Sequence, residues 1–380
     1  MSTRTGGALR LAGAACDTCP ARDGLCVPPE KALTPGRVRL AVVGEVPARQ
    51  DAAEGRIFGG GAGRMLGRGL RTLGLARSDV HWTNAVLCDC KPRDWPKARK
   101  ACAERLRREL AAVAPQAIMP LGPMSLQSSA ALPRKPQILK WRGSVSEIEL
   151  RGANGASRSW VLPTIHPTFV ARAPKWGPTL EIDVARVGRV LRDGFVAPED
   201  APGRRLIVPK TLDALDVALA LLEPGADVSG DVETVGLGPT RTALVCQGFS
   251  DGTTTIVLPH SKASNGIEPF WGFPDRVVER VNNMWAQHRC ITHNGPAFDH
   301  IVFARYGFKI GKWGDTLLAS HATAGHMPKN LAHVVTQILD VPPWKQLEDR
   351  GVDIERLWHY NARDCLYTIL AWNLLKGQIT

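Results

Sequence analysis

Residues 228–233 read Val-Ser-Gly-Asp-Val-Glu, so two acidic side chains end a short apolar run. This pattern predicts a β-strand, in which Asp231 and Glu233 lie on one side because residues i and i+2 share a face. Two neighbouring carboxylates repel each other unless a cation lies between them, which favours a site for a hard divalent metal ion. By itself, the pair is also what a solvated strand end would contain.

Two motifs further along the chain carry similar side chains. Asn294-Gly-Pro-Ala-Phe-Asp299 follows the strand-like run 290–292, which places Asp299 where a helix would begin. Tyr360-Asn-Ala-Arg-Asp364 lies in a helical pattern, and its four-residue spacing puts Tyr360 and Asp364 on one helix face. The sequence therefore predicts that four carboxylates and a phenol converge.

These motifs, in this order, resemble the DEDDy 3′–5′ exonuclease domains, and are most similar to the proofreading domains of bacterial-type (family A) DNA polymerases. The resemblance covers about residues 204–380 and implies a ribonuclease-H-like fold. It implies two Mg²⁺ or Mn²⁺ ions about 4 Å apart. Their ligands would be Asp231, Glu233, Asp299 and Asp364. Tyr360 would orient the attacking water, and Asn294 would contact the substrate. We expect Asp315 to cap a helix instead of binding metal.

The first half alternates apolar runs with helical patterns, which indicates an α/β domain with crossover helices. The runs lie at 38–43 and 117–121, and the helical patterns at 63–73 and 97–113. Residues 196–205 contain Pro and Gly without periodicity and are predicted to be a linker between domains at 1–195 and 206–380. In the second domain we expect strands at 205–208, 228–232, 242–249 and 253–258, and a helix at 275–287.

The nine cysteines are unevenly spaced. Cys16 and Cys19 form a C-x2-C pair, and Cys88, Cys90 and Cys102 follow as a second group, whereas the other four appear isolated, Cys26 among them. In an intracellular protein this pattern favours a four-thiolate metal site over disulfides. Zinc and an iron–sulfur cluster both accept such ligands, so the spacing leaves the choice open.

Four motifs of the first half, together with its cysteines, resemble the iron–sulfur (family 4) uracil-DNA glycosylases. They are Gly-Glu-Val-Pro at 44–47, Arg-Ile-Phe-Gly-Gly-Gly-Ala-Gly at 56–63, Thr-Asn-Ala-Val-Leu-Cys at 83–88, and Leu-Pro-Thr-Ile-His-Pro-Thr at 162–168. The resemblance covers about residues 10–195 and implies an α/β/α sandwich with a [4Fe-4S] cluster. The implied cluster ligands are Cys16, Cys19, Cys88 and Cys102, with Cys90 as an alternative.

A glycosylase must stack the extruded base, read its edge and stabilise the negative charge that develops on it. Phe58 offers a stacking face, and the Asn84 amide offers both a donor and an acceptor. His166 would donate to the uracil carbonyl oxygen, and Glu45 is a further candidate catalytic residue. The backbone amides of the glycine run 59–63 would meet phosphate or the flipped nucleotide.

The net charge of +12 lies in the first half, which carries 31 Lys and Arg against 18 Asp and Glu up to residue 203. Such a cationic domain suits a polyanion such as DNA. The helix predicted at 97–113 is the best candidate for a phosphate-contacting face. Its basic side chains are Lys97, Arg99, Lys100, Arg105, Arg107 and Arg108.

Together these features predict a 3′–5′ DNA exonuclease joined to a DNA-binding, glycosylase-like domain, active in replication proofreading or repair. Alternatives are a bifunctional enzyme that also excises uracil, a non-catalytic polymerase accessory factor, and an exonuclease acting on RNA. We expect a separately encoded DNA polymerase partner, because no polymerase follows residue 364, and a bacterial or phage-like setting. The apolar runs are too short for a membrane span or a signal-peptide core, so we expect a cytoplasmic protein.

Overall fold

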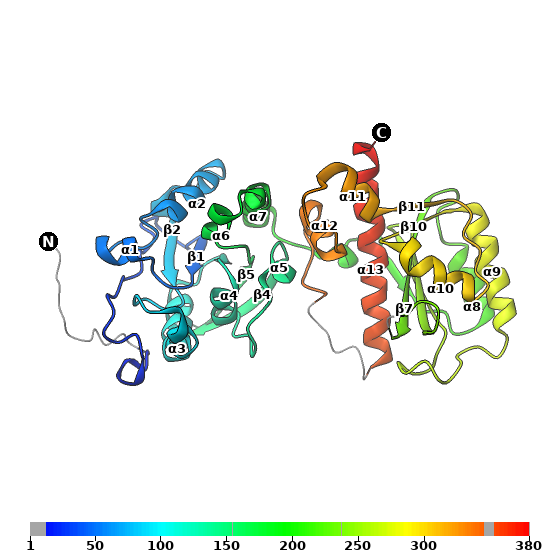
Figure 1. Cartoon of the computed structure of the whole chain (residues 1–380), viewed down its shortest axis with the longest axis horizontal. Helices are drawn as coiled ribbons and strands as arrows, with labels where there is room; N and C mark the ends of the chain where they lie inside the picture. Colours follow the sequence, from blue (N-terminus) through cyan, green and yellow to red (C-terminus); the bar gives the residue numbers. More distant parts are fainter. Residues whose placement is uncertain (1–12, 154, 237, 346–352, 380) are drawn as a thin grey trace. The chain divides into compact units, whose positions relative to one another are not determined.

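The computed structural model describes residues 13–153, 155–236, 238–345 and 353–379. The chain divides into two compact units, Met1–Phe195 (unit 1) and Val196–Thr380 (unit 2) (Figure 1). Each unit contains one sheet with helices packed on it, so the predicted α/β class is confirmed. Among these described residues, no helix has the length and apolar character that a membrane span requires.

The sheet of unit 1 has the strand order β2-β1-β3-β5-β4. Its strands are β1 (Leu40–Gly44), β2 (Val80–Asn84), β3 (Ala117–Pro120), β4 (Ser146–Gly152) and β5 (Gly155–Val161). All neighbours are parallel except β4, which runs antiparallel to β5. Gly44 pairs with Asn84, so β1 and β2 end side by side and the segments that follow them start at the same edge.

Helices cover the sheet of unit 1 because their apolar faces pack against alternate strand residues. The helices are α1 (Arg49–Glu54), α2 (Gly61–Thr72), α3 (Trp95–Val113), α4 (Pro123–Ser129), α5 (Ile138–Trp141), α6 (Pro167–Arg172) and α7 (Gly177–Asp193). Leu106 and Leu110 of α3 pack with Ala41, Val43 and Ile118 of the sheet. Figure 1 shows α2, α6 and α7 gathered together, apart from α3 and α4.

The sheet of unit 2 is mixed and has the strand order β11-β10-β7-β8-β9-β6. Its strands are β6 (Arg205–Ile207), β7 (Asp227–Val235), β8 (Ala243–Ser250), β9 (Thr254–Pro259), β10 (Arg289–Thr292) and β11 (Trp313–Asp315). The central strand β7 runs parallel to β10 and antiparallel to β8. The register of β7 against β8 shifts between Glu233 and Thr234, directly after the acidic pair.

The two faces of β7 have different neighbours in unit 2. The helices are α8 (Leu212–Leu219), α9 (Pro274–Gln287), α10 (Asp299–Arg305), α11 (Thr316–Ala324), α12 (Leu331–Ile338) and α13 (Ile354–Leu375). Val228 and Val232 pack into a core with α8 and α9. On the opposite face, the Ser229 hydroxyl donates to the carbonyl oxygen of Cys365 in α13 at 2.8 Å. Residues 231 and 233 share that face, so the acidic pair points toward α13, the red helix in Figure 1.

The predicted linker 196–205 packs into unit 2. Within it, Pro198–Asp200 forms a short 3-10 helix, and Arg205 already belongs to β6. Glu199 accepts hydrogen bonds from Arg363 (2.7 Å) and from the Tyr367 hydroxyl (2.5 Å), both on α13. The absence of periodicity at 196–205 therefore reflects an irregular segment held by side chains of α13.

Candidate functional site

The end of β7 and the middle of α13 bring three carboxylates together in unit 2. Asp231, Glu233 and Asp364 each place one oxygen within 4.8 Å of the others. Asn361, one helical turn before Cys365, donates its amide to Asp231 Oδ2 at 2.7 Å and is completely buried. This spacing suits a shared divalent cation, because a hard ion is bound by several oxygen ligands at once.

Asp299 adds a fourth carboxylate from the start of α10. Its Oδ1 accepts a hydrogen bond from the Val232 backbone N–H, which lies between the two acidic residues of β7, at 3.2 Å. Burial raises the pKa of Asp299 to about 7, with Asp315 and Asp364 adding to the rise. Burial and then the charges of Asp299, Asp364 and Glu233 also raise the pKa of Asp231 well above its ordinary value. The metal-free carboxylates therefore repel each other strongly.

Tyr360 lies one turn before Asp364 on α13, as the spacing predicts, and two residues that the sequence analysis missed join this pair. Lys345 donates to the Tyr360 hydroxyl oxygen and to Asp364 Oδ2, each at 2.6 Å. Trp344 donates its indole N–H to Asp364 Oδ1 at 2.7 Å. Burial lowers the pKa of Lys345, but Asp364 and Tyr360 raise it overall. Lys345 carries no motif signal, because its contacts depend on a turn outside any regular element.

The remaining motif residues of unit 2 surround this centre in supporting roles. Asp315 accepts from the backbone N–H groups of Leu317 (2.8 Å) and Leu318 (3.2 Å), so the predicted helix cap is confirmed. Asn294 is exposed and adopts a left-handed backbone with φ of 65°, directly before the segment that leads to Asp299. His293 lies 2.8 Å from the Thr316 hydroxyl and therefore packs against the start of α11.

In unit 1, the paired ends of β1 and β2 place Phe58 and Asn84 beside each other. A Cβ on Gly44 would collide with Asn84 Oδ1 and would lie 2.6 Å from the Phe58 ring, so the glycine lets both side chains approach this edge. Asn84 is 2% exposed, and the Phe58 ring stacks near His166 with centroids 6.3 Å apart. The structure thus brings together the three side chains expected to bind a flipped base.

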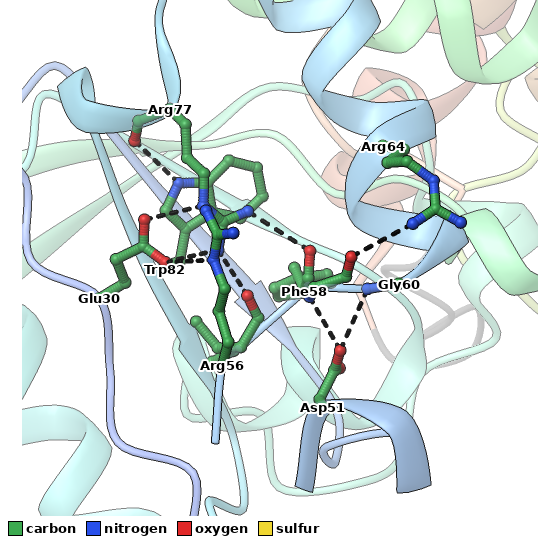
Figure 2. A network of polar contacts seen from close by, with 10 residues as sticks. Glu30, Asp51, Arg56, Phe58, Gly60, Arg64, Arg77 and Trp82 are labelled. Atoms are coloured by element: carbon green, nitrogen blue, oxygen red, sulfur yellow. Dashed lines mark hydrogen bonds and ion pairs between the residues drawn. The ribbon is translucent and has the colours of Figure 1, made fainter. Parts of the chain in front are cut away.

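A polar network holds the turn that carries Phe58 (Figure 2). Phe58 has a left-handed backbone with φ of 50°, which is unfavourable for a residue with a side chain. Arg77 donates to the carbonyl oxygens of Ile57 and Phe58 and forms a two-point ion pair with Glu30. The Arg77 guanidinium also lies 4.9 Å from the centre of the Trp82 ring. Neither Glu30 nor Arg77 carried a motif signal, because their contacts join distant parts of the chain.

Asp51 holds the other side of this turn, as Figure 2 shows. Its Oδ1 accepts from the backbone N–H groups of Gly59 (2.9 Å) and Gly60 (3.3 Å). The sequence analysis expected these amides to meet phosphate or the flipped nucleotide. In the structure both amides donate to Asp51, so this part of the glycine run shapes the turn that carries Phe58.

His166 is poised as a neutral hydrogen-bond donor. The Thr168 backbone N–H donates to His166 Nδ1 at 3.2 Å, so Nδ1 is an acceptor and a neutral ring carries its proton on Nε2. Burial, followed by the charge of the nearby Arg172, lowers the pKa of His166 to about 4 against a smaller opposing effect of Asp51. The imidazole is therefore neutral at physiological pH, with an Nε2–H group able to donate.

Glu45 is held at the start of α4. Its Oε1 accepts from the Met124 backbone N–H at 2.8 Å, and a Cβ on Gly122 would lie 2.9 Å from the same oxygen. Burial raises the pKa of Glu45. Glu45 directly follows β1, so it lies at the same strand ends as Asn84.

The structure contradicts the predicted role of one basic residue of α3, Arg105. Lys97 is exposed and Arg99 is half-buried, which lowers the pKa of Arg99. Arg105, expected on the phosphate-contacting face, is only 5% exposed. It donates to the carbonyl oxygens of Asn84 (2.6 Å) and Ala85 (2.9 Å), so it supports the end of β2 and is not available to DNA.

The structure gathers six cysteines beside the N-terminal half of α3. Cys19 and Cys102 belong to one buried cluster, and Cys88 and Cys90 pack against it. Cys16 lies in the 3-10 turn Cys16–Thr18 that precedes Cys19, and the Ala15 N–H beside it donates to Ala101 of α3 at 2.9 Å. Cys26 was expected to be isolated but pairs with Cys88 through a β-bridge. Burial raises the pKa of the Cys19 and Cys102 thiols, and neighbouring cysteines add to both rises.

Residues 31–183 match the family described as the Uracil DNA glycosylase superfamily. The type-4 uracil-DNA glycosylase of Archaeoglobus fulgidus is 31% identical over 160 residues, which are 40% of this chain and 77% of the relative. The protein of the same name from Pyrobaculum aerophilum is 30% identical over 190 residues, which are 48% of this chain and 93% of the relative.

Several solved structures resemble part of the chain in fold. The catalytic core of RRP6 from Trypanosoma brucei is 18% identical with a TM-score of 0.36, and 46% of this chain covers 47% of it. Brucella melitensis NrnC is 24% identical with a TM-score of 0.34, and 46% of this chain covers 79% of it. Escherichia coli RNase D, described as an exoribonuclease, is 16% identical with a TM-score of 0.34, and 46% of this chain covers 45% of it. This chain therefore spans about half the length of the RRP6 core and of RNase D.

These TM-scores are low, so the activity of unit 2 is inferred from its own side chains. Unit 1 has the stronger relationship, because its relatives match over most of their own length. The chain belongs, through residues 31–183, to the uracil DNA glycosylase superfamily.

Proposed function

We propose that the protein is a DNA-processing enzyme in which unit 2 is a metal-dependent 3′–5′ exonuclease and unit 1 grips DNA through a uracil-binding pocket. The observation that carries the exonuclease is the convergence of Asp231, Glu233 and Asp364, with oxygens within 4.8 Å of one another, next to Asp299. Buried carboxylates at this spacing are unfavourable without cations, which is the expected property of a site built to bind them.

Mg²⁺ or Mn²⁺ fits this site because every available ligand is a carboxylate oxygen. The ions would be held by Asp231, Glu233, Asp299 and Asp364. When bound, they would supply a water of lowered pKa and stabilise the leaving 3′ oxygen. Tyr360 would orient that water through its hydroxyl group, and Asn361 would keep Asp231 in place through its 2.7 Å hydrogen bond.

A labelled oligonucleotide tests the exonuclease. With a 5′ label and Mg²⁺, single-stranded DNA should shorten stepwise from its 3′ end, and a 3′-terminal phosphorothioate should slow the first step. Asp231→Ala and Asp364→Ala should each lose at least about a hundredfold in rate, whereas Asp213→Ala, on an exposed part of α8, should keep full activity. Wild-type protein that binds DNA without shortening it would instead support a non-catalytic accessory factor.

Uracil excision by unit 1 is a second candidate function, favoured by the neutral tautomer of His166. As the bond between C1′ and N1 breaks, its electron pair passes to the uracil ring, and a neutral Nε2–H donor stabilises that charge without having to lose a proton. Phe58 would stack on the base and Asn84 would read its edge. Free uracil should appear from a uracil-containing oligonucleotide and be lost in Asn84→Ala and His166→Ala. If the wild type releases none, unit 1 is a DNA-binding domain only.

An iron–sulfur cluster is the group that we propose for the cysteines of unit 1. Cys16, Cys19, Cys88 and Cys102 would hold it, since the first two precede α3 and Cys102 lies buried on that helix. The cluster would join the segment around Cys16 and Cys19 and the segment that follows β2 to helix α3. Protein purified without oxygen should be brown and contain four irons per chain; one zinc per chain would reject this assignment.

Both units would act on the same substrate. We infer DNA as the substrate, because uracil is a lesion in DNA and an ordinary base in RNA. Proofreading or repair alongside a separate DNA polymerase, in a bacterial or phage-like replication system, is the setting that we propose. Competition between DNA and RNA oligonucleotides of one sequence tests the substrate, and stronger inhibition by RNA would overturn it.

A further inference from the structure

Lys345 places a positive charge inside the carboxylate centre of unit 2. Its ammonium group donates to Asp364 Oδ2 and to the Tyr360 hydroxyl oxygen, each at 2.6 Å, and lies 4.6 Å from the centre of the Tyr360 ring. The Lys345 side chain is 21% exposed and that of Asp364 is 4% exposed, so the ion pair is largely shielded from water. Neither the three motifs nor their resemblance assigns this lysine a role.

The neighbouring Trp344 fixes the position of Lys345. Trp344 is 2% exposed and donates to Asp364 Oδ1 at 2.7 Å. Its ring meets Tyr367 of α13 edge-on, with centroids 4.8 Å apart, inside a buried cluster. Because the residue before it is anchored in the core, Lys345 is directed at Asp364 by packing and not only by attraction between charges.

The two bonds of Lys345 place it where a divalent ion would compete with it. Asp364 Oδ2 accepts from the ammonium group, and Asp364 is also one of the three residues with converging oxygens. A divalent ion bound there would lie close to a fixed positive charge, and like charges repel strongly where water is largely excluded. At the same time, the bond to Tyr360 holds the phenol oxygen beside Asp364, with its own proton directed away from the ammonium group.

We propose that Lys345 is a positioning residue that serves as a built-in cation: it holds Tyr360 and Asp364 in their working arrangement and competes with divalent metal for Asp364. This inference rests on the exonuclease proposed above. It predicts that one substitution, which removes the charge of Lys345, changes metal affinity and reaction rate in opposite directions. Removing the charge should tighten metal binding, yet it should slow the reaction, because Tyr360 loses the contact that orients it.

Lys345→Met tests both predictions, since methionine has a similar length and no charge. Mn²⁺ binding followed by calorimetry on the full chain should tighten at least tenfold in Lys345→Met. Nucleotide release at saturating Mn²⁺ should fall at least tenfold through kcat, with little change in KM. Lys345→Arg keeps the charge, so its Mn²⁺ affinity should stay near that of the wild type. Lys262→Met is the matched control, because it removes an exposed lysine ion pair elsewhere in unit 2 and should change neither quantity.

The outcomes separate this inference from the exonuclease itself. An inactive wild type that takes up no Mn²⁺ overturns both proposals. An active wild type together with unchanged Mn²⁺ affinity in Lys345→Met overturns only the role of Lys345, as does an arginine variant that binds Mn²⁺ as tightly as the methionine variant. If Lys345→Met fails to fold, the arginine variant and Lys345→Gln carry the same comparison, and equal Mn²⁺ affinity in these two overturns the proposal.

Discussion

Replacing Asp299 by asparagine should stabilise the metal-free protein at neutral pH while abolishing the proposed nuclease activity. Asp299 is 6% exposed, and burial raises its pKa from 3.8 to about 7 although it accepts a hydrogen bond from the Val232 backbone N–H. The Oδ1 of asparagine can accept the same hydrogen bond, so the substitution removes the charge and keeps the shape.

The pH at which this gain in the free energy of unfolding appears depends on whether the folded or the unfolded protein keeps the Asp299 carboxyl group protonated. In the unfolded chain, Asp299 ionises near its ordinary pKa of 3.8, whereas in the folded, metal-free protein it stays protonated until about pH 7. The folded state therefore binds more protons in this interval, and the free energy of unfolding falls as the pH rises through it. The difference between 3.8 and about 7 corresponds to about 4 kcal/mol at most.

We therefore expect Asp299→Asn to raise the free energy of unfolding by about 2–4 kcal/mol at pH 8 and by little at pH 4. For a domain of this size, that is an increase in Tm of about 5–15 °C. Thermal unfolding in EDTA, followed by circular dichroism at both pH values, measures it. Asp213→Asn, on the exposed surface of α8, is the matched control and should not stabilise at either pH. Equal effects of Asp299→Asn at the two pH values, or a lower Tm at pH 8, would show that an ionised Asp299 does not destabilise the metal-free protein.

Three further predictions concern unit 1. Because the pKa of His166 is lowered to about 4, protonation of this histidine should reduce uracil release only as the pH approaches 4; a pH–rate profile that falls near 6.5 and is flattened by His166→Asn would contradict this. Arg142→Met should lower the free energy of unfolding by about 2–3 kcal/mol in urea titrations, because the buried Asp183 loses a two-point ion pair but keeps its ion pair with Arg186; an unchanged free energy of unfolding would argue against it. Cys102→Ser should remove the visible absorbance of anaerobically purified protein, whereas Cys290→Ser, in the core of unit 2, should retain it; equal colour in both variants excludes Cys102 as a ligand.

Local patterns predicted many of the regular elements: spacing of apolar residues identified amphipathic helices, and continuous apolar runs identified buried strands. The helix expected at 275–287 is observed at Pro274–Gln287, and the strand expected at 253–258 at Thr254–Pro259. The strand expected at 228–232 continues to Val235 as β7, because pairing with β8 carries it through the acidic pair. Acidic residues break the apolar pattern at its end, so the sequence alone marks that end too early.

The main features of both sites were visible in the sequence, because their residues lie in short motifs at strand and helix ends. The supporting residues were not. Lys345, Arg77 and Glu199 each act through a contact with a distant segment, and none lies in a motif. Arg105 was misplaced because charge alone suggested an exposed face. Its guanidinium instead satisfies the carbonyl oxygens at the end of β2, which only the folded chain brings to α3.

Anomalous X-ray scattering from crystals soaked in Mn²⁺ tests the central claim most directly. We predict one manganese peak among the oxygens of Asp231, Glu233 and Asp364, and a second between Asp231 and Asp299, about 4 Å from the first. Asp231→Asn should lose both peaks. A wild-type map in which manganese is bound only elsewhere, or in which these carboxylates bind none, would contradict a two-metal nuclease site in unit 2.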